Sequence, residues 1–124
     1  MQKLFLILGS IAMALAVGLG AFGAHGLKNR LTQEMLDIFE TGVRYHFYHA
    51  IGLLIIGLIA SHLPESALLK WSGWLMVAGI LIFSGSLYIL SVSGIRWLGA
   101  VTPIGGICFI ASWVLVALAV WNGL

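Results

Sequence analysis

Residues 4–24 read LFLILGSIAMALAVGLGAFGA, a run of 21 residues without a charged side chain. A helix rises about 1.5 Å per residue, so this run is long enough to cross a hydrocarbon core of about 30 Å. Lys3, the apolar stretch and the small residues Ala21 and Gly23 would also suit a signal peptide, but the run is longer than a usual signal core. We therefore expect residues 4–24 to form a transmembrane helix.

The composition of the whole chain agrees with a membrane location. Of its 124 residues, 61% are hydrophobic and only 8% are charged, whereas about one quarter of a soluble domain is charged. The basic residues behind the net charge of +2 are scattered, which gives no argument for a nucleic-acid partner. Cys108, the single cysteine, excludes an internal disulfide and a cysteine-based metal site. The composition predicts an integral membrane protein with membrane lipids as partners.

Three further apolar stretches lie at about residues 45–63, 71–91 and 99–121. Pro64 provides a natural stop for the second stretch. Trp71 and Trp74 open the third with rings that suit the membrane interface. In the fourth, Thr102-Pro103 is typical of an N-cap followed by proline at the first helical position, so the helix can begin at Pro103 and still span. We expect four transmembrane helices.

The polar segment 26–44 separates the first two spans. Apolar residues recur within it at helical spacing, and polar side chains occupy the opposite side. This pattern predicts a short amphipathic interfacial helix at about residues 32–43. The predicted fold class is an all-α membrane protein, a four-transmembrane-helix bundle with this interfacial helix between its first two spans. We expect a single domain, residues 1–124.

The first span carries small residues at four-residue intervals on two adjacent faces: Ser10, Ala14 and Gly18, and Ala12, Ala16 and Gly20. Small residues allow helix backbones to approach closely in lipid, where packing replaces the hydrophobic drive. The first helix is therefore expected to be central to the bundle or to form a dimer contact, and a homo-oligomer is one possible assembly.

The distribution of basic residues predicts the orientation in the membrane. Lys28, Arg30, Arg44 and Arg96 fall on one side of a four-helix bundle, and Lys3 and Lys70 fall on the other. Basic residues are more frequent in cytoplasmic loops. The excess favours a multi-pass protein of the cell inner membrane with the long loop, residues 26–44, in the cytoplasm and both termini outside.

An up-and-down bundle also brings most polar groups of the spans to the long-loop side. The candidate polar cluster consists of His25, Glu40, Arg44, His46, Tyr48, His49, Ser84, Ser86, Tyr88 and Thr102. Ionisable groups inside a membrane are costly unless they pair or line a cavity. Any binding site is therefore expected in the leaflet of the long loop.

Several interpretations of the cluster are open. Glu40 and Arg44 are four residues apart, so they can pair and tie the long loop to the bundle, or Arg44 can bind an anionic headgroup or substrate. His25, His46 and His49 are weak candidates for a metal site or a proton relay; hydrogen-bonded structural histidines are the simpler reading, and no metal or cofactor is predicted.

The hydroxyl groups of the cluster can also have a purely structural role. Those of Ser84, Ser86 and Tyr88 are expected to form hydrogen bonds between helices or to the preceding turn. Gly105-Gly106, just after the start of the fourth span, permits close backbone approach near a helix N-terminus. Neither feature requires a ligand.

Five motifs in apolar surroundings resemble the YgdD-like family of small membrane proteins. They are Gly23-Ala24-His25-Gly26, Phe39-Glu40-Thr41-Gly42-Val43-Arg44-Tyr45-His46, Tyr48-His49-Ala50, Phe83-Ser84-Gly85-Ser86-Leu87-Tyr88 and Thr102-Pro103-Ile104-Gly105-Gly106. The resemblance covers essentially the whole chain. It implies a four-helix inner membrane protein with distant relatives among small eukaryotic transmembrane proteins, and it implies no activity.

No catalytic constellation is recognisable, so we expect a protein that is not an enzyme. The leading hypothesis is that the polar cluster forms a pocket for a lipid or small amphiphile. Alternatives are a small oligomeric transporter or channel and a structural or assembly partner in the membrane. Small multidrug exporters need a carboxylate in their first span, and residues 4–24 contain none.

Overall fold

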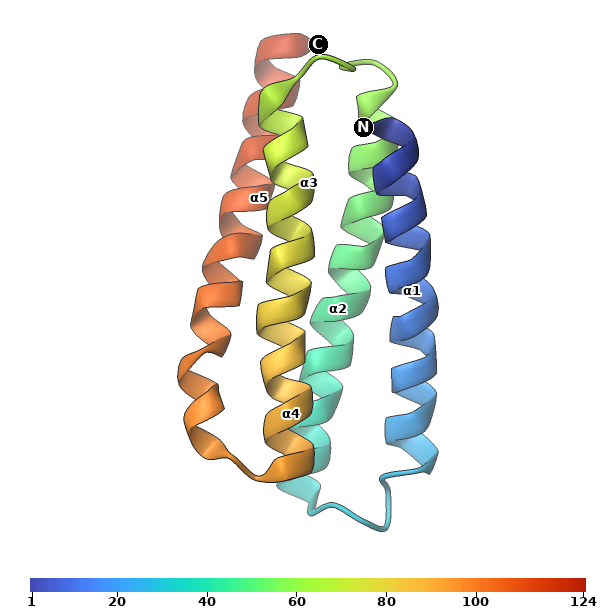
Figure 1. The fold of residues 1–124 in the computed structure, drawn as a ribbon, viewed down its shortest axis with the longest axis vertical. Coiled ribbons are helices and arrows are strands. Elements are labelled where there is room, and N and C mark those ends of the chain that lie inside the picture. Colours follow the sequence, from blue (N-terminus) through green and yellow to red (C-terminus); the bar gives the residue numbers. More distant parts are fainter.

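The computed structural model describes residues 1–124 and consists of four antiparallel helical rods with both termini at one end (Figure 1). The first two rods are α1 (Gln2–His25) and α2 (Gln33–Ala60). The third is α3 (Ala67–Gly79), the π-helical η1 (Ile80–Ser84) and α4 (Gly85–Ser93), and the fourth is the 3-10 helix η2 (Arg96–Ala100) followed by α5 (Thr102–Gly123). All four rods are long and apolar enough to cross a membrane. The predicted all-α, four-span fold is confirmed.

The interfacial helix differs from the prediction. Residues 33–43 are helical, but they continue without a break into the second span and form one helix of 28 residues. The Thr32 hydroxyl caps its start by accepting a hydrogen bond from the Met35 N–H. Gly42 does not interrupt the helix, because it is buried against Tyr88. At about 42 Å, α2 is longer than a hydrocarbon core, so its first turns extend beyond it.

The central helix is α2, which packs against α1, α3, η1 and α4. The prediction that the first helix is central to the bundle is therefore wrong. Instead, α1 lies at the edge of the bundle beside α2 (Figure 1). Only Phe5, Gly9 and Ala16 are buried along α1. Most of the small residues that were predicted to form two packed faces are therefore not buried within the bundle. A dimer contact through α1 stays a prediction.

The apolar core occupies the middle of the bundle and the half nearer the termini. Phe5, Leu53, Ile56, Leu69 and Met76 are its most deeply buried side chains. At the other end the chain turns between α4 and η2 at Gly94, whose positive φ of 75° favours glycine. The apolar core therefore fills the middle of the bundle and the end with the termini, while the long loop and the residues of the candidate polar cluster lie towards the other end.

Candidate functional site

The π-helical segment η1 joins two neighbouring helices at the polar end. The Ser84 hydroxyl donates to the Gly42 carbonyl of α2 over 2.7 Å. On the other side, a Cβ added to Gly105 of α5 would overlap the backbone of Phe83. A π turn is a common way to redirect side chains in the middle of a helix. Here it lets one segment contact α2 through a hydroxyl and α5 through its backbone.

Further hydroxyls of the predicted cluster link α4 to its neighbours. Ser86 Oγ lies 2.6 Å from Thr102 Oγ1 at the start of α5, and Tyr88 Oη lies 2.9 Å from His46 Nδ1 of α2. With Ser84, these are the interhelical hydrogen bonds predicted for this part of the chain. They use Ser84, Ser86, Tyr88 and Thr102 to hold the bundle together.

Ser72 and Ser112 form a polar pair that the sequence reasoning did not single out. Each hydroxyl donates to the backbone carbonyl of the other residue, over 2.8 Å from Ser72 and 2.7 Å from Ser112, and both residues are fully buried between α3 and α5. The available signal was Ser112 in the middle of an apolar span, because its hydroxyl must find a partner inside the protein.

His49 has both ring nitrogens occupied. Nδ1 lies 2.7 Å from the Tyr45 carbonyl, which can only accept, so Nδ1 carries the proton. The Trp113 indole N–H, which can only donate, points at Nε2 over 3.0 Å. The ring also stacks on Phe109 at a centroid distance of 3.5 Å. The contacts hold His49 as the neutral Nδ1–H tautomer, leaving no lone pair for a metal ion.

His46 lies at the edge of an apolar groove between α1 and the third rod. The groove has a volume of about 260 Å³ and is lined mainly by aliphatic side chains, with His46 and Tyr88 as its aromatic polar members. The buried His46 ring bonds to Tyr88 and also faces the backbone of Ala12 on α1. These contacts bridge α1, α2 and α4, which gives His46 a structural place.

The remaining candidates do not join these residues. His25 and Tyr48 are exposed, and no three His, Cys, Asp or Glu side chains come together in a way that could hold a metal ion. The weak metal candidates His25, His46 and His49 are therefore separated by the fold. The single pocket expected from the polar cluster does not form, because helical periodicity turns its members towards different faces.

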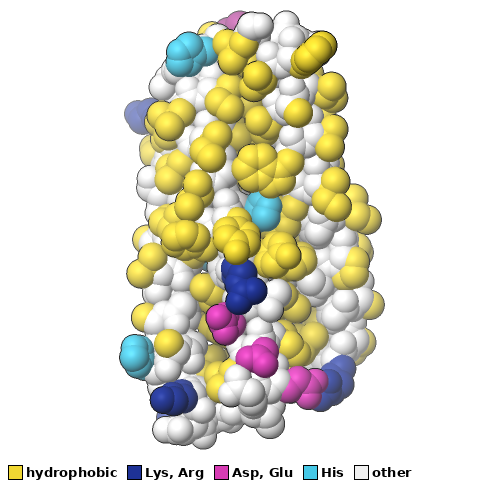
Figure 2. Space-filling model, turned by 180° about the vertical axis from the view of Figure 1, so that it is seen from behind, with side chains coloured by type: hydrophobic (Ala, Val, Ile, Leu, Met, Phe, Trp, Pro, Cys, Tyr) yellow, Lys and Arg dark blue, Asp and Glu magenta, His cyan; other side chains and the backbone are white.

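Charged residues follow the exposed side of α2 from the long loop towards the middle of the molecule (Figure 2). Arg44 Nη2 lies 3.4 Å from Glu40 Oε1, with side chains that are 52% and 68% exposed. Both residues belong to α2, so the pair cannot tie the loop to another helix. That link is made by Arg96 of η2, which lies 2.8 Å from Glu34 of α2.

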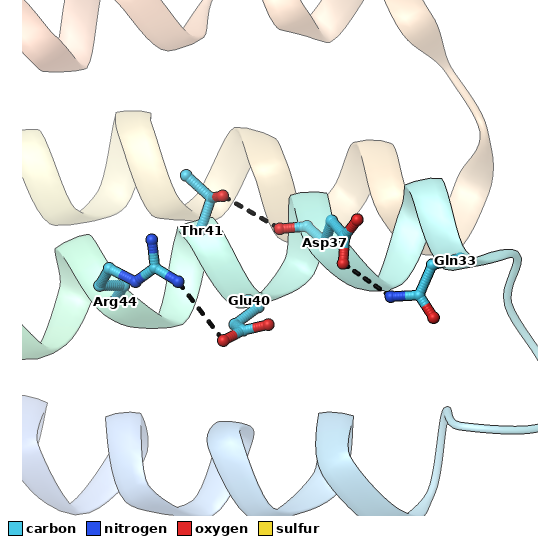
Figure 3. A network of polar contacts seen from close by, with 5 residues as sticks. All are labelled: Gln33, Asp37, Glu40, Thr41 and Arg44. Atoms are coloured by element: carbon cyan, nitrogen blue, oxygen red, sulfur yellow. Dashed lines mark hydrogen bonds and ion pairs between the residues drawn. The ribbon is translucent and has the colours of Figure 1, made fainter.

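A crevice of about 400 Å³ lies between the end of α1 and the start of α2. Its charged lining residues are Lys28, Asp37 and Glu40. Gln33 Nε2 donates to Asp37 Oδ1 over 2.7 Å, and the carboxylate of Glu40 extends toward α1 (Figure 3). Neither Lys28 nor Asp37 forms an ion pair. Of the predicted cluster only Glu40 lines this crevice, and sequence reasoning missed Lys28 and Asp37.

The depth of Arg44 in the membrane follows from the packing of α1 on α2. Gly20 faces Val43, and Gly23 faces Phe39. Arg44 therefore lies beside the uncharged run of α1, roughly 6–8 Å before that run ends at Ala24. A long cationic side chain at this depth extends towards the interface, and Arg44 does so in the direction of Glu40 (Figure 3).

Four apolar rods with interhelical hydrogen bonds and a charged interfacial end define a multi-pass integral membrane protein. A family model described as "Protein of unknown function (DUF423)" matches residues 19–106, and the chain belongs to this family. UPF0382 membrane protein YwdK of Bacillus subtilis is 53% identical over 118 residues, covering 95% of this chain and 96% of the relative.

UPF0382 membrane protein SH2409 of Staphylococcus haemolyticus is 47% identical over 121 residues, covering 98% of both chains. A Staphylococcus aureus relative, UPF0382 membrane protein SAUSA300_0565, is 48% identical over the same length. No solved structure matches the chain. The relatives support the membrane location and carry no activity in their names.

Proposed function

We propose that this chain is a non-enzymatic membrane protein that binds a phospholipid in the crevice between α1 and α2. The observation that carries the proposal is the amphiphilic lining of the crevice. Gly20, Ala24 and Val43 line its membrane side, while Lys28 and Asp37 line its loop side. A lipid requires both kinds of surface in this order along the membrane normal.

The length of the crevice also suits a lipid. Its lining residues on α2 extend from Gln33 to Val43, which corresponds to about 15 Å along a helix. Since Phe39 and Val43 face the last part of the uncharged run of α1, the crevice extends from the headgroup region into the outer part of the hydrocarbon core. Its position beside Arg44 supports the reading of that residue as a partner for a headgroup phosphate.

Transport driven by histidine protonation receives less support. A relay needs a ring nitrogen that can exchange its proton, and both nitrogens of His49 are held by Tyr45 and Trp113. The buried side-chain nitrogen and oxygen atoms of the bundle all have hydrogen-bond partners. These contacts favour a stable scaffold around a peripheral lipid site.

The proposal also includes the orientation in the membrane, the resemblance to the YgdD-like family and the oligomeric state. The excess of basic residues at the long-loop end supports a cell inner membrane protein with residues 26–44 in the cytoplasm and both termini outside. The motifs support a place near the YgdD-like family, and the exposed small residues of α1 would suit a homo-oligomer. A reporter fused after Leu124 that works only outside the cytoplasm tests the orientation.

The lipid proposal is tested by filling the crevice. Ala24 is exposed and lines it, whereas the equally small and exposed Ala21 does not. We expect protein purified in mild detergent to retain phospholipid, Ala24→Leu to lose most of it, and Ala21→Leu to match the unsubstituted chain. Quantification of extracted lipid by mass spectrometry measures this. Absence of retained phospholipid, or equal retention by both variants, would contradict the proposal.

A further inference from the structure

The order of charges along α2 identifies the class of headgroup that the crevice would bind. From the membrane centre outwards, the exposed side of α2 presents a cation, Arg44, and then two anions, Glu40 and Asp37. Successive members are four and three residues apart, so their Cα atoms lie about 6 Å and 4.5 Å apart along the helix axis. The Arg44 side chain extends towards Glu40, but its guanidinium group still lies on the side of the Glu40 carboxylate that faces away from Asp37 (Figure 3). The cation is thus the deeper charge.

A zwitterionic phospholipid carries its charges in the complementary order. Its phosphate is attached to the glycerol and lies deeper than the ammonium group at the end of the headgroup. A phosphate at the depth of Arg44 would meet a guanidinium group that has five N–H donors and makes one 3.4 Å contact with Glu40. The ammonium group would then lie beside Glu40 and Asp37.

Asp37 has no basic partner in the protein. Its carboxylate, next to that of Glu40, can therefore bind a cation that donates hydrogen bonds. Asp37 accepts a hydrogen bond from Gln33, and no lysine or arginine lies within ion-pair distance of it. The three charged lining residues, Lys28, Asp37 and Glu40, carry one positive and two negative charges. A primary ammonium offers three N–H donors to these oxygens, whereas a quaternary choline ammonium has none.

We propose that the crevice selects a phospholipid with a primary-ammonium zwitterionic headgroup, of the ethanolamine class. This inference rests on the proposed function. Arg44, which follows the lining residue Val43 and lies next to the crevice, binds the phosphate. Glu40 and Asp37 bind the ammonium group, and the membrane side of the crevice contacts the first carbons of an acyl chain. An anionic glycerol headgroup would satisfy Arg44 but would leave both carboxylates facing a neutral group.

The test offers the detergent-solubilised full chain three phospholipids with identical acyl chains and ethanolamine, choline or glycerol headgroups, and counts bound lipids by native mass spectrometry. We expect roughly three- to tenfold more ethanolamine lipid than either competitor, the range that one or two exposed charge-assisted hydrogen bonds provide. Asp37→Asn should lower the ethanolamine-to-choline ratio towards one, because it removes the carboxylate that has no basic partner in the protein. Asparagine still accepts the Gln33 hydrogen bond, so the local structure is kept.

The matched control is Glu34→Gln, which removes a carboxylate at the same end of α2 but outside the crevice. It should leave the ratio unchanged. Equal binding of all three lipids, or a preference for the glycerol headgroup, would overturn the headgroup assignment while lipid binding itself stands. Failure to bind any of the three would instead remove the proposed function.

Discussion

Two polar pairs on the transmembrane rods, Ser72 with Ser112 and Glu40 with Arg44, differ in burial and in the helices that they join. The serine pair is fully buried and links α3 to α5 through short hydrogen bonds. The charged pair lies on α2 alone, with 52% and 68% of its side chains exposed. The first pair connects helices, and the second leaves hydrogen-bonding capacity for a molecule outside the protein.

The physical reason for the difference is the solvent. The hydrocarbon core of a bilayer contains almost no water, so a hydroxyl buried in a close-packed bundle is satisfied by a partner from the protein. Ser84 and His49 follow the serine pattern, with partners on the backbone and on other side chains. Near the interface, a charged group can use water and headgroups instead. Burial therefore separates structural polar residues from those available to a ligand.

The largest expected effect on stability is at Gly105, a buried residue of α5 that lies against the backbone of Phe83. A Cβ added at Gly105 would overlap the backbone of Phe83, whereas one added at Gly106 would lie 3.9 Å from the Phe83 ring. We expect Gly105→Ala to lower the free energy of unfolding by about 1–3 kcal/mol. Gly106→Ala should be neutral or stabilising by up to about 1 kcal/mol, because alanine favours helix. Thermal unfolding in detergent measures both.

A smaller loss of stability is expected when the buried serine hydroxyls are removed. Ser72→Ala and Ser112→Ala each delete a hydrogen bond between α3 and α5, and each is expected to cost about 1 kcal/mol of unfolding free energy. Ser10 is the matched control, because its exposed hydroxyl donates within α1 to Leu6. Ser10→Ala should change stability by less than about 0.5 kcal/mol. Equal effects at the three positions would mean that burial does not separate the two classes.

Sequence reasoning predicted four spans correctly because their signal is local, as in the uncharged run at residues 4–24. The predicted start of the fourth helix was wrong in detail. Thr102 is the first residue of α5 and not its N-cap, which is Val101, and the Thr102 hydroxyl bonds to Ser86 and to the Leu98 carbonyl instead. The continuity of α2 does not follow from residue type and spacing, since residues 33–43 are amphipathic while the following span is apolar. The packing of Gly42 against Tyr88 helps to join these two patterns into one helix.

Sequence reasoning could indicate which residues share the long-loop end of the bundle, but not the helix face on which each of them lies. The four-residue spacing predicted the contact between Glu40 and Arg44. It could not show that His49 turns inwards to Trp113 while Tyr48 turns outwards, because that depends on how the rods are rotated. Asp37 became part of a crevice only through the approach of α1 to α2, which is a tertiary contact.

The smallest expected effect on stability concerns the charged pair. Its single 3.4 Å contact joins two exposed side chains of one helix, and exposed pairs of this kind contribute about 0.3–0.5 kcal/mol. Arg44→Gln should therefore change the free energy of unfolding in detergent by less than about 0.5 kcal/mol. A loss as large as that of Ser72→Ala would place Arg44 among the structural residues and break the comparison. A small change, measured with reduced phospholipid retention, would separate its ligand contact from its role in the fold.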